Sequence, residues 1–326
     1  MREEMLRQLR PIFGQWSCVH RYAVDPGAVA VLSAMEAAVE RPGVWFAEGW
    51  AAANLSRPYV PAALLAERLV AAPQDMALLL GSQTSFARTH EILRMCALAS
   101  VATVFVFDHW KNYAAHFVPP DDGAPVLPDR IIVPDAVAVA GLRADLQRQD
   151  VDAGTLAGRI VVAGHPAVEA ACERIGAMES GAARLKAVLG AAGRPLVAVF
   201  LDPMERSDDP ERDPGYDWAS TLDRMAEAAA SRRDGARFLV RPHPRQDGDR
   251  VRERLRGWLD RGLDGCVTGE PAETLIAVAD EVWGMTSITL VTALRCGRRI
   301  VSFQVGRTAA GARESNPHIE PFAVTT

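Results

Sequence analysis

The sequence predicts an α/β protein with two Rossmann-like domains, on the basis of three observations. Short β-rich apolar runs alternate with longer amphipathic stretches along nearly the whole chain. This alternation favours parallel sheets that are covered by helices on both faces. It is interrupted by a long polar helical stretch at about 167–190 and then restarts. The 326 residues also suffice for two domains of about 150 residues each.

In the first half, strands are expected at 44–49, 76–82, 101–108, 130–134 and 159–164, with helices between them at 61–71, 87–99 and 136–149. Residues 118–128 form a proline-rich loop inside this half. Asp121 and Asp122 in this loop are a pair of carboxylates, but the prolines around them favour a surface turn over a catalytic pair.

In the second half, strands are expected at 195–202, 237–240, 265–269, 281–285 and 298–305, with helices at 216–232, 249–260, 271–280 and 287–297. We therefore predict an N-terminal domain over residues 1–180 and a C-terminal domain over residues 181–326. In such folds, ligands bind beyond the carboxyl ends of the strands. The loops that follow the predicted strands are the places to look for a site.

Composition excludes several classes of function. A net charge of −5 argues against a chain-wide surface for polyanions, and we expect no nucleic-acid partner. The seven histidines lack the spacing of a metal site, and we expect neither a metal nor a cofactor. The five cysteines are scattered without C-x-x-C spacing, which favours reduced thiols over a disulfide framework: Cys18, Cys96, Cys172, Cys266 and Cys296.

The expected location is the cytoplasm. The N-terminal stretch has charges but no apolar core followed by a cleavage site, so a signal peptide is not expected. No apolar run reaches the roughly 18 residues that a membrane helix needs. Peripheral association with a membrane remains compatible with this pattern.

The first candidate site residue is His243, which lies between Pro242 and Pro244 directly after a predicted strand. The prolines restrict the loop, and an imidazole can donate to an anionic oxygen. Arg241 and Arg245 on either side could steer an anionic ligand. The alternative is a proline-stiffened turn with a structural histidine.

The second candidate is Gly284-Met285-Thr286-Ser287, where a predicted strand ends and a helix begins. Hydroxyl groups at a helix start cap free amides, and those amides can bind phosphate. Simple capping is the alternative. Ser82 belongs to the corresponding hydroxyl-rich stretch of the first half, where capping is the favoured interpretation. No P-loop or G-x-G-x-x-G pattern occurs in the sequence.

The third candidate is the run of polar and aromatic residues from Asp108 to Tyr113, at the end of the strand at 101–108. Asp108 or His109 could act as a general base, and Lys111 and Asn112 could hold a substrate. The alternative is an exposed loop with aromatic anchors.

Two further strand ends carry polar residues. His165, before Pro166, is interpreted as structural, with a ligand contact as the lesser option. The loop that begins at Asp202 suits a contact with a donor or acceptor, although solvation alone also explains its charges.

The second half resembles GT-B glycosyltransferases, most closely the bacterial surface-polysaccharide enzymes: capsule Kdo transferases, polysialyltransferase-like enzymes and CDP-glycerol transferases. The likeness covers roughly residues 195–305. In those families a His-Pro motif and a later hydroxyl pair bind the phosphate and ribose of a cytidine nucleotide. His243 and Pro244 match the first motif, and Thr286 and Ser287 match the second. Many GT-B enzymes also hold the ribose with a glutamate, where Thr292 stands in this chain.

The resemblance implies a GT-B fold, with a cleft between an N-terminal acceptor domain and a C-terminal nucleotide-sugar donor domain. It implies a metal-independent glycosyltransferase that moves a sugar, with a CMP-activated acidic sugar favoured, onto a surface glycan or glycolipid. His243 would act on the departing phosphate. The alternatives are a nucleotide-sugar 2-epimerase or hydrolase, and a non-catalytic protein that binds nucleotide sugars.

Overall fold

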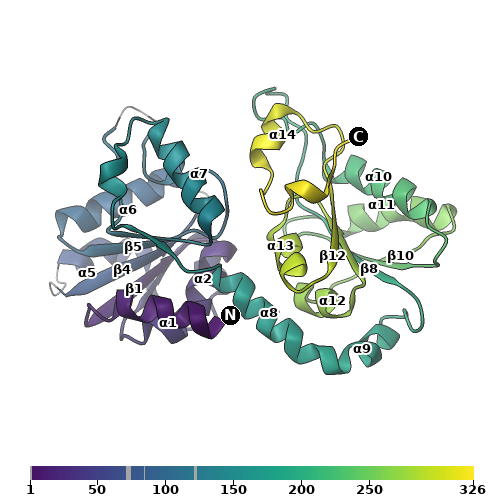
Figure 1. Ribbon diagram of the computed structural model, residues 1–326, viewed down its shortest axis with the longest axis horizontal. Helices are drawn as coiled ribbons and strands as arrows, with labels where there is room; N and C mark the ends of the chain where they lie inside the picture. Colours follow the sequence, from purple (N-terminus) through teal and green to yellow (C-terminus); the bar gives the residue numbers. More distant parts are fainter. Residues whose placement is uncertain (1, 71–74, 84, 121–122) are drawn as a thin grey trace. The chain divides into compact units, whose positions relative to one another are not determined.

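The computed structural model describes residues 2–70, 75–83, 85–120 and 123–326. The chain forms two compact units, Met1–Ala170 (unit 1) and Ala171–Thr326 (unit 2). Each unit has its own parallel sheet (Figure 1). The prediction of two parallel-sheet α/β domains is confirmed. The units divide within helix α8 (Pro166–Met178), whereas the boundary expected at 180/181 lies in the short 3-10 turn that follows this helix.

The sheet of unit 1 has the strand order β3-β2-β1-β4-β5-β6-β7. The strands are β1 (Cys18–Ala23), β2 (Trp45–Ala47), β3 (Val60–Pro61), β4 (Met76–Gly81), β5 (Ala102–Val106), β6 (Arg130–Val133) and β7 (Ile160–Val162). The order changes direction between β1 and β4. That pair is the topological switch point, where sheets of this kind bind ligands.

The helices of unit 1 are α1 (Arg2–Phe13), α2 (Pro26–Ala34), α3 (Glu36–Val39), α4 (Gly49–Asn54), α5 (Leu65–Val70), α6 (Phe86–Leu98) and α7 (Ala136–Gln147). In α1 the residues Leu6, Leu9 and Phe13 lie on one helical face and pack into a core with Val19 and Leu79 of the sheet. Helices α6 and α7 lie on the other side of the sheet from α1 (Figure 1).

Strand β1 lies inside the sheet, between β2 and β4, although the sequence did not predict it. Its apolar run is broken by His20 and Arg21. Arg21 is nevertheless buried, because its guanidinium donates to the carbonyl of Val19 (2.5 Å) and lies 3.4 Å from the carboxylate of Glu36. A buried charge that is paired and hydrogen-bonded is tolerated inside a sheet, but such pairing cannot be read from the strand itself.

The sheet of unit 2 has the order β10-β9-β8-β11-β12-β13. The strands are β8 (Leu196–Phe200), β9 (Arg237–Arg241), β10 (Asp264–Val267), β11 (Glu281–Gly284), β12 (Arg299–Phe303) and β13 (Ala323–Val324). The switch point lies between β8 and β11. All but β13 fall on strands that the sequence predicted.

The helices of unit 2 after α8 are α9 (Ala182–Val188), α10 (Trp218–Ala230), α11 (Gly248–Asp260), α12 (Ala272–Val278), α13 (Ile288–Arg295) and α14 (Ala309–Glu314). Helices α10 and α11 cover one face of the sheet, and α12 and α13 lie on the other (Figure 1). Under α11, the ring of Phe238 lies 5.3 Å from that of Trp258 and 5.4 Å from that of Trp283. This aromatic cluster anchors the core of the unit.

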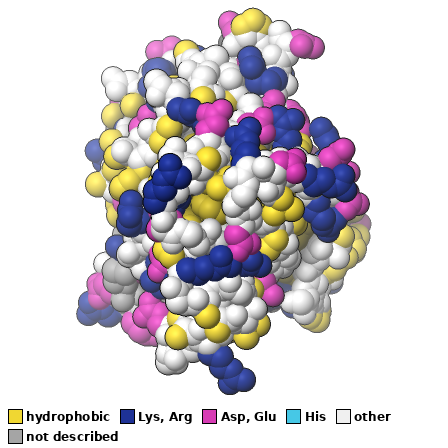
Figure 2. Space-filling model, turned by 90° about the vertical axis from the view of Figure 1, so that its right-hand side faces the viewer, with side chains coloured by type: hydrophobic (Ala, Val, Ile, Leu, Met, Phe, Trp, Pro, Cys, Tyr) yellow, Lys and Arg dark blue, Asp and Glu magenta, His cyan; other side chains and the backbone are white. Residues whose placement is uncertain are grey.

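Short 3-10 turns complete the fold at Ala62–Leu64, Ala114–His116, Ala153–Leu156, Glu179–Gly181 and Glu320–Phe322. Basic and acidic side chains are interspersed over the face shown in Figure 2. Ion pairs also join helices within unit 2, such as the pair of Arg254 in α11 with Asp223 in α10. Among the helices of the described residues, none has both the length and the apolar character that crossing a membrane requires.

Candidate functional site

The turn after β9 fixes the tautomer of the neutral His243 ring. The backbone N–H of Arg245 donates to Nδ1 of His243 at 3.1 Å. Nδ1 is therefore an acceptor, so the proton of the neutral ring sits on Nε2. Partial burial lowers the pKa of His243, and the positive charge of Arg245 lowers it further. The shift favours the uncharged ring, which offers one N–H donor at Nε2. That nitrogen has no hydrogen-bond partner among the residues that the structure describes.

A chain of hydrogen bonds connects this turn to the start of α13. The side chain of Gln246 accepts from the backbone N–H of His243 (2.6 Å) and donates to the carbonyl of Asp202 (3.2 Å). The carboxylate of Asp202 accepts from the backbone N–H of Thr286 (2.6 Å) and from its hydroxyl (2.9 Å). These residues follow β9, β8 and β11, which are neighbours at the switch point. The structure therefore links His243 and Thr286 at the edge where a ligand is expected.

The two hydroxyls of the Thr286-Ser287 pair have different roles. Thr286 donates its hydroxyl proton to Asp202. Ser287 is the N-cap of α13 and accepts from the backbone N–H of Thr289 at 3.3 Å. A hydroxyl that accepts can still donate its proton, so Ser287 keeps an O–H for a ligand. The expected capping is present, and it leaves one donor of the pair available.

Gly284 and Arg241 both have structural roles in the fold. A Cβ on Gly284 would lie 3.1 Å from the carbonyl oxygen of Phe200 and 3.2 Å from Leu290, which explains the glycine by the close packing of β11. The guanidinium of Arg241 donates to the carbonyl of Glu270. Pro244 lies in the turn itself. These residues shape the edge of the sheet.

Asp202 is the residue on which this arrangement depends most. We expect Asp202→Ala to lower the free energy of unfolding by about 1–3 kcal/mol, because it leaves the backbone N–H and hydroxyl of Thr286 without their charged acceptor. Thermal unfolding checks this, with Asp208→Ala in the same loop as the matched control, since Asp208 is exposed. Equal melting temperatures for the two variants would contradict the role assigned to Asp202.

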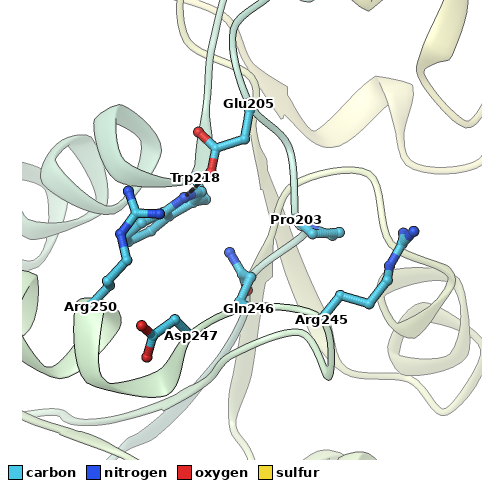
Figure 3. Close-up of a pocket in the computed structure, with 7 residues that line it drawn as sticks. All are labelled: Pro203, Glu205, Trp218, Arg245, Gln246, Asp247 and Arg250. Carbon is cyan, nitrogen blue, oxygen red and sulfur yellow. Dashed lines mark hydrogen bonds between the residues drawn. The ribbon is translucent and has the colours of Figure 1, made fainter.

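A pocket of about 200 Å³ adjoins the His243 turn (Figure 3). It is lined by Pro203, Glu205, Trp218, Arg245, Gln246, Asp247 and Arg250. The indole N–H of Trp218 donates to Glu205 at 2.8 Å, and the guanidinium of Arg250 lies 5.5 Å from the Trp218 ring centre. Figure 3 shows Arg245 extending away from Trp218. Gln246 lines the pocket, and its side chain also accepts a hydrogen bond from the backbone N–H of His243. The pocket therefore lies directly beside the His243 turn.

In unit 1, Ser82 joins the ends of β4 and β5. Its hydroxyl donates to the carbonyl of Val106 (3.1 Å) and accepts from the backbone N–H of Asp108 (3.2 Å). The carboxylate of Asp108 lies against the start of α2, where a Cβ on Gly27 would fall 1.9 Å from it. Only a glycine leaves room for the carboxylate there. Ser82 therefore positions Asp108.

The environment of Asp108 favours its protonated form. Its side chain is 18% exposed, and burial raises its pKa to about 6. The nearby Asp25 raises the pKa as well, while His165 opposes the shift. A carboxyl group that titrates close to neutrality suits proton transfer.

His165 has a structural explanation. Its Nε2 hydrogen-bonds the carbonyl of Asp108 at 2.9 Å, and its Nδ1 accepts from the backbone N–H of Val168 at 3.3 Å. The ring also stacks on Trp110 with 5.4 Å between ring centres. Both nitrogens are used, so His165 holds the Asp108 loop in place.

The remaining residues of the loop after β5 are less closely tied to Asp108. His109 stacks on the buried His116 with 5.5 Å between ring centres, and its Nε2 lies 3.8 Å from the Asp108 carboxylate. Lys111 is half-buried, and Asn112 is exposed with a φ of 57°. Asn112 lines a separate pocket of about 540 Å³, whose lining does not include Asp108. Asp121 and Asp122 lie outside the described residues, as does Thr84.

Two polar features of unit 1 were not predicted from the sequence. Gln83 is 4% exposed, and within the described part of the chain neither of its amide atoms has a hydrogen-bond partner. Unpaired buried amides are rare in folded proteins. In addition, the guanidinium of Arg88 donates to the carboxylate of Glu48 (2.9 Å) and to the hydroxyl of Tyr22 (3.2 Å). The position of Gln83 directly after the strand expected at 76–82 was an available signal, whereas Glu48 falls inside the strand expected at 44–49.

Comparison with known proteins identifies the fold. No protein-family model matches the chain, and no curated protein matches it in sequence. Among solved structures, it is similar to UDP-GlcNAc 2-epimerase from Neisseria meningitidis bound to UDP-GlcNAc (TM-score 0.54, 9% identity, 87% of this chain and 82% of that one). It is also similar to Anabaena HepE in complex with UDP (TM-score 0.52, 13% identity, 95% and 85%). The fold is GT-B.

A third similar structure is the wall teichoic acid polymerase TagF soaked with CDPG (TM-score 0.50, 10% identity, 92% of this chain and 74% of that one). Identities this low establish the fold alone. Within the GT-B fold, the His243–Gln246–Asp202–Thr286 chain lies at the switch point of the second Rossmann-like unit.

Proposed function

We propose that this protein is a metal-independent glycosyltransferase that uses a nucleotide-activated sugar. The observation that carries the proposal is the hydrogen-bond chain from His243 to Thr286 at the switch point of unit 2. It fixes the position of two donors, Nε2–H of the neutral His243 and the hydroxyl of Ser287. Donors fixed in advance stabilise negative charge as it develops, without reorganisation during the reaction.

The proposed reaction breaks the bond between the anomeric carbon of the sugar and a phosphate oxygen of the nucleotide. Negative charge then appears on the departing phosphate, where His243 and Ser287 donate. The acceptor hydroxyl forms the new bond to carbon and loses its proton to a base, for which we propose Asp108. In this proposal unit 2 holds the donor and unit 1 supplies the acceptor side, with Gln83 as a further candidate for contacts with acceptor hydroxyls.

For the donor we propose a pyrimidine nucleotide sugar, and within this class a CMP-linked acidic sugar. The three similar structures named above contain UDP-GlcNAc, UDP or CDPG, which supports the nucleotide class. The likeness of the His243-Pro244 and Thr286-Ser287 motifs to cytidine-nucleotide enzymes supports the finer choice. The proposed acceptor is a surface glycan or glycolipid.

A melting-temperature screen against CMP, CDP, UDP and GDP tests the nucleotide class. A ligand at about 100 times its dissociation constant adds about 2.7 kcal/mol to the free energy of unfolding, which we expect to raise the melting temperature by about 5–10 °C. The cytidine nucleotides should give the largest shift. A shift with GDP alone, or with none of the four nucleotides, would contradict the proposal.

A nucleotide-sugar 2-epimerase is the second candidate, because the similarity to the Neisseria meningitidis epimerase has a TM-score of 0.54. The two activities leave different products. A transferase releases the nucleotide, whereas an epimerase changes the configuration of the sugar.

A further inference from the structure

Two cysteines of unit 2 lie in contact, although they are 124 positions apart in the sequence. Sγ of Cys296 is 3.0 Å from Sγ of Cys172. Cys172 lies in α8, and Cys296 is the C-cap residue of α13. Both side chains are half-buried. Among the described residues, no other two cysteines are paired in this way.

The two sulfur atoms are in direct contact but are not bonded. A disulfide has an S–S distance of about 2.05 Å, so the two atoms need to approach by about 1 Å. Rotation about the Cα–Cβ bonds of the two cysteines moves their sulfur atoms by a distance of this size. Partial exposure gives a small oxidant access to the thiols.

We propose that Cys172 and Cys296 form an oxidisable dithiol, which a peroxide converts into a disulfide between α8 and α13. In the first step one thiol attacks hydrogen peroxide, becomes a sulfenic acid and releases one water molecule. In the second step the other thiol attacks the sulfenic sulfur, the S–S bond forms and a second water molecule leaves. Two thiols and one peroxide thus give one disulfide and two waters.

The bond would fix the C-terminal end of α13, the helix whose N-cap residue is Ser287. It would also close a loop between residues that are 124 positions apart. Long closed loops restrict the unfolded chain most. The proposed modification is independent of whether the protein transfers a sugar.

The other three cysteines are in different environments. Cys96 is fully buried, and burial raises the pKa of its thiol, so it stays protonated. Cys266 accepts from the guanidinium of Arg237 at 3.5 Å. Cys18 lies 3.8 Å from the ring of His20. None of these thiols has a second sulfur in contact within the part of the chain that the structure describes.

The experiment treats the full reduced chain with a small excess of hydrogen peroxide, blocks remaining thiols with N-ethylmaleimide and digests with trypsin without reduction. Each cysteine of the pair falls in its own tryptic peptide, 160–174 for Cys172 and 296–298 for Cys296. We expect mass spectrometry to show these two peptides joined, with two hydrogen atoms fewer than their reduced sum. We also expect the melting temperature to rise by about 5 °C or more and to return on reduction.

Cys172→Ser and Cys296→Ser should each abolish the joined peptide and the peroxide-induced rise, and Cys266→Ser should leave both in place. If the peroxide-treated wild-type chain yields both peptides separately, each with its cysteine blocked by N-ethylmaleimide, the proposal is overturned. Oxidation of Cys296 beyond the sulfenic stage while Cys172 stays free, or joining to a different cysteine, would also overturn it. These results come from the wild-type protein and do not depend on how the variants fold.

Discussion

Replacing His243 with alanine is expected to lower the rate of sugar transfer by about 10²–10³-fold, the usual effect of removing one fixed donor from a developing anion. The substitution removes the Nε2–H, which has no internal partner among the described residues. The melting temperature should stay nearly unchanged, because the ring is half-buried and accepts a single backbone hydrogen bond, from Arg245. Steady-state kinetics with a nucleotide-sugar donor and thermal unfolding together check this.

His243→Asn separates the two functions of the ring. An asparagine can still accept from the backbone of Arg245 and keep the turn, but its amide reaches less far than Nε2. We expect the transfer rate of His243→Asn to lie near that of His243→Ala, and its melting temperature to equal that of the wild type. His318→Ala, which changes a partly buried histidine elsewhere in unit 2, is the matched control and should keep the wild-type rate. Wild-type turnover in His243→Ala, with a normal melt, would remove this residue from the mechanism.

Replacing Asp108 with asparagine is expected to lower the rate by about 10²–10⁴-fold, as for loss of a general base, and at the same time to stabilise the fold. The base must be ionised, and the pKa of Asp108 is raised to about 6. The wild-type rate should therefore fall as the pH drops below about 6. The amide of the Asp108→Asn variant cannot take a proton, so its residual rate should lack this dependence.

The gain in stability follows from the direction of the pKa shift. Because the folded-state pKa of Asp108 is raised, the folded chain holds a proton between about pH 4 and 6 that the unfolded chain has already released. The stability of the wild-type chain then falls as the pH rises through this interval. Asparagine avoids that loss, which amounts to about 2–3 kcal/mol at neutral pH.

Thermal unfolding of Asp108→Asn at pH 4 and pH 7 measures this difference. The variant should have a higher melting temperature than the wild type at pH 7 and nearly the same melting temperature at pH 4. Asp152→Asn, which changes the carboxylate that precedes a 3-10 turn of the same unit, is the control and should show neither effect. An unchanged rate, or a variant less stable than the wild type at pH 7, would contradict the role proposed for Asp108.

The sequence predicted much of the fold because apolar runs and amphipathic stretches alternate so regularly. It failed at β1, where His20 and Arg21 interrupt the apolar pattern of a strand inside the sheet. The burial of Arg21 depends on Glu36, a residue of the following helical region. A strand whose charges are neutralised by a distant partner has no local signal.

The candidate residues were found in the sequence, but the contacts that organise them were not. Asp202 and Thr286 are 84 positions apart and meet because β8 lies between β9 and β11. That neighbourhood is a property of strand order, which the alternation of strands and helices does not specify. In the same way, the stretch around Gly27 gave no indication that it receives the Asp108 carboxylate.

The most direct test of the account is incubation of the protein with CMP-, UDP- and GDP-sugars in the absence of an acceptor, followed by analysis of both the nucleotide and the sugar. We expect slow release of free nucleotide from a pyrimidine nucleotide sugar, most readily from the CMP-sugar, and loss of this release in His243→Ala. A sugar of changed configuration that is still attached to its nucleotide would contradict it in favour of an epimerase. Binding of the nucleotide sugar without any turnover would contradict it in favour of a non-catalytic protein.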